Sequence, residues 1–210
     1  MRKKIILLNV AIFSFNFFYA QTLNKDSLNH QKMIEDSLKM EKLLAKEVYP
    51  VLKGSKWSGV IPVANPMEVP DKNIDYKLLF ELTYNNPDSL AKEINGGLDE
   101  IARIINLHVA SGIPVKKIIP VILVHGAALD AILNNESYNK KHKINNPNIK
   151  LLSDMENLGA KLIACGQAMA FFDFKKEDML PEVKISLTAK TVLSAYQLKN
   201  YVLYDISVIK

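Results

Sequence analysis

The chain has 210 residues, of which 49% are hydrophobic and 23% charged, so it can bury the core of one domain and still carry an appendage. Its formal net charge is +5, but Arg2, Lys3 and Lys4 stand at the extreme N-terminus. Subtracting these three from the 27 basic residues leaves 24 against 22 acidic ones. Nucleic-acid binding needs a concentrated basic face, so we expect no nucleic-acid partner.

The first twenty residues have the three parts of a secretory signal peptide. A basic start is followed by a mostly apolar stretch from Ile5 to Phe18, and the small residue Ala20 precedes Gln21. A membrane anchor is the alternative, but this stretch is short and interrupted for a hydrocarbon core of roughly 30 Å. We therefore predict a signal peptide at 1–20, cleaved after Ala20, a periplasmic or secreted protein, and no stable membrane span after cleavage.

A helical extension and a connector are expected at 21–75. Apolar residues recur at helical spacing between Leu28 and Val48, and Pro50 ends this pattern. The following stretch, up to Asp75, is interrupted by glycines and prolines, which indicates an extended connector. Its Trp57 is expected to fill a groove, with stacking on a ligand as the alternative.

From residue 76 to residue 210 the sequence alternates strand and helix patterns. The strands are predicted at 77–83, 118–124, 161–165, 183–187 and 201–206. Strands separated by helices imply right-handed crossovers and a parallel sheet with helices on both faces. We therefore predict one α/β domain over 76–210, preceded by the helical N-terminal extension.

The connections carry more specific signals. Asn86 is predicted to cap a helix that contains the Gly96-Gly97 pair and ends before Gly112, and the glycine pair indicates close approach of another backbone or subunit. The segment 134–148 is polar and rich in lysine, so we expect a mobile surface excursion there. Thr188 is predicted to cap the helix that precedes the last strand.

Ligands of open parallel sheets bind outside the carboxyl ends of the strands. The residues just after the predicted strands are therefore the candidate site residues, and they are Asn85, His125, Gly126, Cys165, Gly166, Gln167 and Thr188. If the second and third strands are neighbours, His125 and Cys165 emerge at the same edge. Cys165 also precedes a helix, whose free N–H groups favour a thiolate.

Each candidate has a plainer interpretation. Cys165 is the only cysteine, so it cannot pair within the chain and is buried and inert, paired with another chain, or reactive. His125 can simply satisfy a carbonyl of the turn, and the other three histidines (His30, His108 and His142) suit surface or packing positions. One cysteine and one histidine fall short of a zinc ligand set, and no Gly-rich loop follows the first strand, so we predict no metal and no cofactor.

Several segments taken in order resemble the DsrE/YchN-like (DsrE/DsrF-like) family, in particular its exported members. They are Val124 to Leu129, Leu162 to Ala168, Leu180 to Lys184 and Ala189 to Tyr201. The resemblance covers Tyr76 to the C-terminus. It implies a three-layer α/β/α sandwich with a five-stranded parallel sheet, and homo-oligomers, commonly trimers or hexamers, with pockets near the subunit contacts.

In the sulfur-relay branch of that family, a cysteine at the place matched by Cys165 accepts persulfide sulfur. The position of Cys165 and this resemblance together lead us to expect a sulfur-handling protein acting on a small sulfur compound, in which His125 moves a proton and the amides of Gly166 and Gln167 hold the anionic sulfur. The alternative is a non-catalytic oligomeric module that binds a small ligand or an envelope partner, with an inert, buried cysteine. Whether the chain is an enzyme stays open at this stage.

Overall fold

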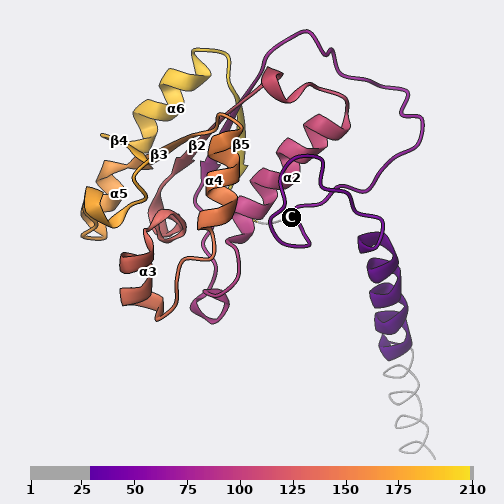
Figure 1. Ribbon diagram of the computed structural model, residues 1–210, viewed down its shortest axis with the longest axis horizontal. Helices are drawn as coiled ribbons and strands as arrows, with labels where there is room; N and C mark the ends of the chain where they lie inside the picture. Colours follow the sequence, from indigo (N-terminus) through magenta and orange to yellow (C-terminus); the bar gives the residue numbers. More distant parts are fainter. Residues whose placement is uncertain (1–28, 209–210) are drawn as a thin grey trace, which may run out of the picture. The chain divides into compact units, whose positions relative to one another are not determined.

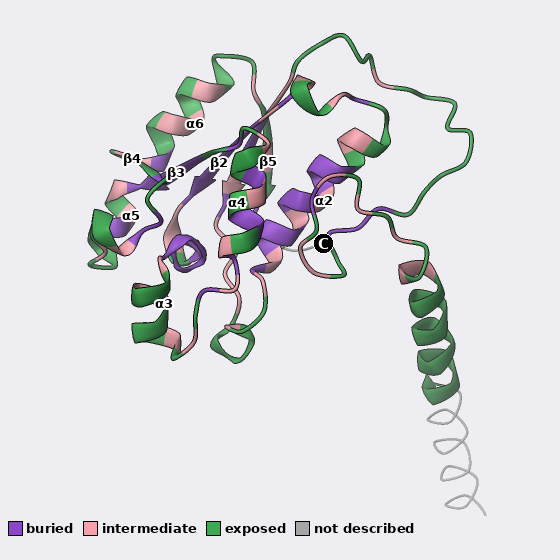
Figure 2. Cartoon of the chain, in the orientation of Figure 1, coloured by how far each residue is buried: buried purple, intermediate pink, exposed green. Residues whose placement is uncertain are grey.

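The computed structural model describes residues 29–208 and divides the chain into two units, Met1–Lys46 and Glu47–Lys210. In the first unit a helix spans 29–44, inside the predicted range. Its apolar side chains are exposed, at least 46% for each of Met33, Ile34, Leu38 and Met40 (Figure 2). The expected signal peptide at 1–20 lies outside the described residues. Of the helices that are described, none has the length and apolarity needed to cross a bilayer.

The second unit is built on a five-stranded, all-parallel sheet (Figure 1), which confirms the predicted fold class. The strand order is β4-β3-β2-β1-β5. The strands span Tyr76–Leu82 (β1), Ile118–Val124 (β2), Lys161–Cys165 (β3), Lys184–Ser186 (β4) and Val202–Ile206 (β5). All five lie within about two residues of their predicted ranges, and β2 and β3 match them at both ends.

Helices cover both faces of this sheet, as the resemblance implied. One face carries α2 (Gly96–Ala110) and α4 (Ile149–Asn157), whose buried side chains join the larger core. The other face is covered by α6 (Ala189–Gln197), which packs on β1 and β2. The remaining helices are α3 (Asn135–His142) and the short α5 (Gly166–Phe171), which directly follows β3.

Alternation along the strands divides the core into two parts. In β1, Leu78, Phe80 and Leu82 point into the larger core, whereas Leu79 belongs to the smaller core beneath α6. β2 has no exposed residue along its length, as expected for a central parallel strand covered on both faces. The pleat therefore assigns every residue of these strands, polar ones included, to either the α2 face or the α6 face.

The helix predicted to start after Asn86 begins ten residues later, at Gly96. Asn95 is its N-cap, and Asn86 instead organises the loop: its side-chain amide donates to the carbonyls of Leu90, Glu93 and Ile94, and its Oδ1 accepts the amide of Gly96. The prediction was wrong because these bonds hold the intervening residues in a short 3-10 turn (Asp88–Leu90) and a loop.

At Gly97 the close neighbour is a side chain of the sheet, not the backbone of another helix as predicted. A Cβ on Gly97 would lie 2.4 Å from Cδ1 of the fully buried Leu82, so glycine lets the first turn of α2 rest closely on β1.

The segment 134–148, predicted to be a mobile surface excursion, does lie largely at the surface but forms a helix. It contains α3, whose N-cap Asn134 accepts the amide of Ser137 through its side chain. The buried side chain of Asn146 then donates to the carbonyls of Ala131 and Leu133. The polar residues that suggested a surface loop make these internal hydrogen bonds.

The connector packs as part of the second unit, because one buried side chain of α2 holds its backbone. Oδ1 of Asn106 accepts the amides of Val51 and Leu52 at 3.2 and 3.0 Å. Its Nδ2 donates to the carbonyls of Leu52 and Ser58 at 2.7 and 2.9 Å. Asn106 is fully buried, so these bonds replace its contacts with water and fix the segment 51–58 against α2.

We therefore expect Asn106→Ala to lower the free energy of unfolding by about 3 kcal/mol, since it leaves buried backbone groups without partners. Urea unfolding followed by circular dichroism measures the change. Asn157→Ala, at the exposed end of α4, is the matched control and should change stability by less than about 0.5 kcal/mol. Equal effects of the two substitutions would contradict this role of Asn106.

Candidate functional site

The carboxyl ends of β1, β2 and β3 bring a carboxylate, an imidazole and a thiol to one face of the sheet. β2 and β3 are neighbours, and Val124 pairs with Ala164, so the next residues, His125 and Cys165, stand at corresponding positions. Leu79 faces α6, and alternation places Glu81 on the same face. Because β2 and β3 are neighbours, His125 and Cys165 emerge at the same edge of the sheet, as expected.

The thiol of Cys165 lies beneath the start of α6. The residue is only 4% exposed and packs among apolar side chains, namely Leu79, Val121, Leu123, Ile163 and Ala189. Sγ accepts a hydrogen bond from the backbone amide of Ala189, the first residue of α6, at 3.2 Å. This hydrogen bond joins the end of β3 to the start of α6.

His125 is bound to a carboxylate rather than to a turn carbonyl. Its Nε2 lies 2.9 Å from Oε1 of Glu81, and the two side chains are 24% and 19% exposed. The imidazole is therefore held in place and still reaches solvent, which suits a group that gives or takes a proton. Sequence reasoning missed Glu81, although it is the one carboxylate of β1 and alternation could have placed it on this face.

Gly166 and Gln167 do not hold the sulfur as expected. The amide of Gln167 donates to the carbonyl of Leu187 at 3.1 Å. A Cβ on Gly166 would lie 2.6 Å from the carbonyl oxygen of Ser186, so glycine is required where α5 starts beside β4. These residues fix the turn after β3, and the amide that does reach Sγ belongs to Ala189.

Thr188 caps α6 as predicted, because its Oγ1 accepts the amide of Lys190 at 3.4 Å. It thereby positions the helix start whose Ala189 amide reaches Cys165. Gly126 adopts a φ of +63° directly after His125 and makes the predicted turn.

Asn85 belongs to a different group. Its side-chain amide donates to Oδ2 of Asp130 at 3.4 Å, and the same oxygen lies 2.5 Å from Nζ of Lys141 and 3.4 Å from Nε2 of His142. His142, expected to be a surface or packing residue, has a side chain only 8% exposed and packs against the Tyr138 ring at 4.5 Å between centroids. Sequence reasoning missed this cluster, since its members come from separate loops and α3.

The Asp130 cluster surrounds a cavity of about 10 Å³, enough for one water molecule. The hydroxyl of Tyr138 donates to the carbonyl of Ala91 at 2.6 Å, so α3 is bound to the loop that precedes α2. Burial, and then the charge of Asp130, raise the pKa of Tyr138. The contacts of this cluster hold α3 against the loops around it.

Within residues 29–208, no group of three or more His, Cys, Asp or Glu side chains is arranged to hold a metal ion. The side chains gathered at the α6 face are a thiol and an imidazole–carboxylate pair. Such a set can carry a nucleophile and a proton donor.

The match to a family model agrees with this architecture. The model of the DsrE/DsrF-like family matches residues 77–204, more than half of the chain. Among solved structures, the protein of unknown function MTH1491 from Methanobacterium thermoautotrophicum is similar at 13% sequence identity and a TM-score of 0.46, over 62% of this chain and 99% of that one. A search of curated proteins finds no match.

Proposed function

Because this chain belongs to the DsrE/DsrF-like family, we propose that it handles sulfur through Cys165, which accepts a sulfur atom from a small persulfide or polysulfide. The observation that carries the proposal is the hydrogen bond from the Ala189 amide to Sγ at 3.2 Å. A thiolate is the nucleophile in sulfur transfer, and an N–H donor at a helix start favours it over the neutral thiol.

The transfer is a displacement at sulfur. The Cys165 thiolate attacks the outer sulfur of a donor R–S–SH, a new Sγ–S bond forms, and the S–S bond of the donor breaks. The donor sulfur leaves with that electron pair and takes a proton from His125, which gives R–SH. Cys165 becomes a persulfide and the donor is reduced to a thiol, so no other oxidant is needed.

His125 has the position that this proton transfer requires. Its register position corresponds to that of Cys165 on the neighbouring strand, and Glu81 lies on its Nε2 side at 2.9 Å. A carboxylate partner orients the imidazole ring. The pair is partly exposed, so the proton can be replaced from solvent after each transfer.

Burial of the thiol sets a condition on this chemistry. With 4% of Cys165 exposed, a donor reaches Sγ only when its cover opens. That cover is the start of α6, whose Ala189, Val192 and Leu193 pack in or against the smaller core. We propose that local opening at 187–193 admits the donor, since regions with few buried contacts open at lower free energy than the whole domain.

The same burial favours a second candidate, a non-catalytic oligomeric module in which Cys165 is a small core residue. Large apolar side chains stand exposed near the β4 edge, with Phe171 82% and Leu187 75% exposed, and they are suited to a contact with another copy. In this alternative the sulfur atom has no role beyond packing.

We also propose that the chain is exported through cleavage after Ala20. The sequence pattern of residues 1–20 supports this, with its basic start, apolar middle and small residue before the cut.

Intact-mass measurement after exposure to inorganic polysulfide tests the sulfur proposal. We expect wild type to gain the mass of one sulfur atom and Cys165→Ser to gain none, since Cys165 is the only cysteine. His125→Gln should slow the gain by about a hundredfold through loss of the proton donor. His30→Gln, an exposed histidine on helix 29–44, is the matched control and should have no effect.

The absence of any gain on wild type, or an equal gain on Cys165→Ser, would refute sulfur transfer at this residue. The first of these outcomes would support the oligomeric module instead.

N-terminal sequencing of the protein recovered from cells that express the full chain tests export. We expect the mature protein to begin at Gln21. Replacing Ala20 by a large residue, as in Ala20→Tyr, should leave the N-terminal segment attached, because the cleavage position requires a small side chain. Recovery of an intact N-terminus from the wild-type chain would argue against cleavage.

A further inference from the structure

A cleft of about 570 Å³ lies beside the start of α2, on the sheet face opposite Cys165. Its lining combines two aromatic, two aliphatic and two acidic side chains: Trp57, Tyr84, Leu90, Ile94, Glu93 and Asp99. We propose that this cleft binds a small organic cation, whose ammonium group is recognised by the carboxylates of Asp99 and Glu93 and by the ring of Trp57. The site is separate from the thiol and independent of sulfur transfer.

The backbone donors around the cleft are already used, which argues against an anionic ligand. At the start of α2, the amide of Gly96 donates to Asn86 Oδ1, and the amides of Gly97 and Leu98 donate to Asn95 Oδ1. The amide of Ser55 donates to Asp99 Oδ1 at 2.7 Å. An anion bound here would find none of these N–H groups free, although helix starts ordinarily supply them.

The charges of the side chains that line the cleft also favour a cation. Glu93 and Asp99 are acidic, and Lys56 is the one basic residue among the cleft residues. Asp99 is only 4% exposed, and burial raises its pKa, so its ionised form is poorly solvated. A cation entering the cleft would supply the counter-charge that Asp99 lacks.

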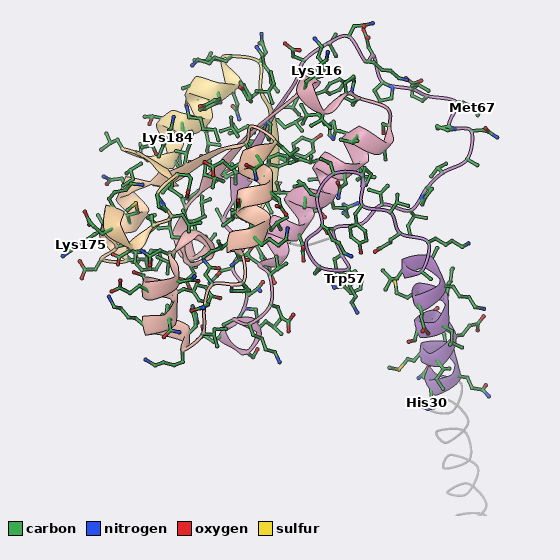
Figure 3. All side chains as sticks on the ribbon, viewed as in Figure 1. His30, Trp57, Met67, Lys116, Lys175 and Lys184 are labelled. Carbon is green, nitrogen blue, oxygen red and sulfur yellow. The ribbon has the colours of Figure 1, made fainter. Side chains whose placement is uncertain are left out.

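Trp57 is held in position to contact such a ligand. It is 53% exposed, although it belongs to a tight turn in which the Gly54 amide donates to Ser58 Oγ and the Trp57 amide donates to Ser55 Oγ. Figure 3 shows Trp57 on this turn. The Nζ atom of Lys56 lies over the indole at 5.0 Å from the ring centroid, so the ring already accepts a cation of this chain.

These observations define the ligand by its chemistry. It carries a positive charge, donates hydrogen bonds or presents an alkylammonium surface, and has an apolar part that fits against Leu90 and Ile94. The groove expected at Trp57 from the sequence is thus present, but it is open rather than filled by the indole.

Trp57 is the only tryptophan of the chain, so its fluorescence reports directly on the cleft. The probes are choline and its uncharged isostere 3,3-dimethylbutan-1-ol, with inorganic phosphate as an anion. We expect choline to give a saturable change in Trp57 emission, and the other two to bind at least about tenfold more weakly or not at all.

Asp99→Asn should weaken choline binding at least about tenfold, because it removes the charge while the Asn side chain can still accept the Ser55 amide. If Asp99→Asn does not fold, Glu93→Gln, on the exposed rim of the cleft, provides a second variant. Asp154→Asn, a carboxylate of α4 outside the cleft, is the matched control and should bind as wild type does. Equal binding of choline and its isostere, no saturable change with choline, or unchanged affinity in both acidic-residue variants would each overturn the proposal.

Discussion

The pairing of β2 with β3 determines how the thiol of Cys165 and the imidazole of His125 stand relative to each other. Val124 pairs with Ala164, so His125 and Cys165 leave their strands side by side, on the face that α6 covers. A slip of one residue would turn Cys165 toward the α2 face and separate it from the imidazole. The hydrogen bond from the Ala189 amide to Sγ links β3 to α6, so the positions of the thiol, the imidazole and the helix start depend on one register.

The two faces of the sheet differ in the size of the core that they cover. The α2 face has α2, of 15 residues, and α4, of nine, together with the tie through Asn106 to the connector and the Asp130 cluster. The α6 face has the smaller core beneath a single nine-residue helix, α6, and the start of α5. In the sulfur-transfer proposal only this smaller core has to open, whereas the open cleft beside Trp57 needs no such movement.

Local patterns predicted much of the fold, because strand alternation and apolar runs are properties of neighbouring residues. The ends of β2 and β3, the turn at Gly126 and the cap at Thr188 follow from such patterns. Side chains that bind distant backbone could not be placed in this way. Asn86 has the local pattern of a helix cap, but the amide that its side chain accepts belongs to Gly96, ten residues further along the chain. Likewise, no residue near Asn106 in the sequence indicates that its side chain binds the backbone of 51–58.

The candidate site was predictable in position and less so in detail. The rule for parallel sheets selected His125 and Cys165, and the register brings them to one edge. Glu81 could have been found as the one carboxylate of β1. Gly166 and Gln167 were assigned to the sulfur because they follow Cys165, but their contacts are with β4 and Leu187, and the amide at Sγ comes from 24 residues further along.

Sulfur transfer at Cys165 requires that the thiol become reachable through a local opening of its cover. The rate of Cys165 alkylation by iodoacetamide at increasing urea concentration, below the unfolding transition, tests this requirement. We expect a rate that is nearly independent of urea and well above the rate set by global unfolding, because little surface is exposed when the start of α6 moves. A rate that rises with urea in parallel with global unfolding would contradict it.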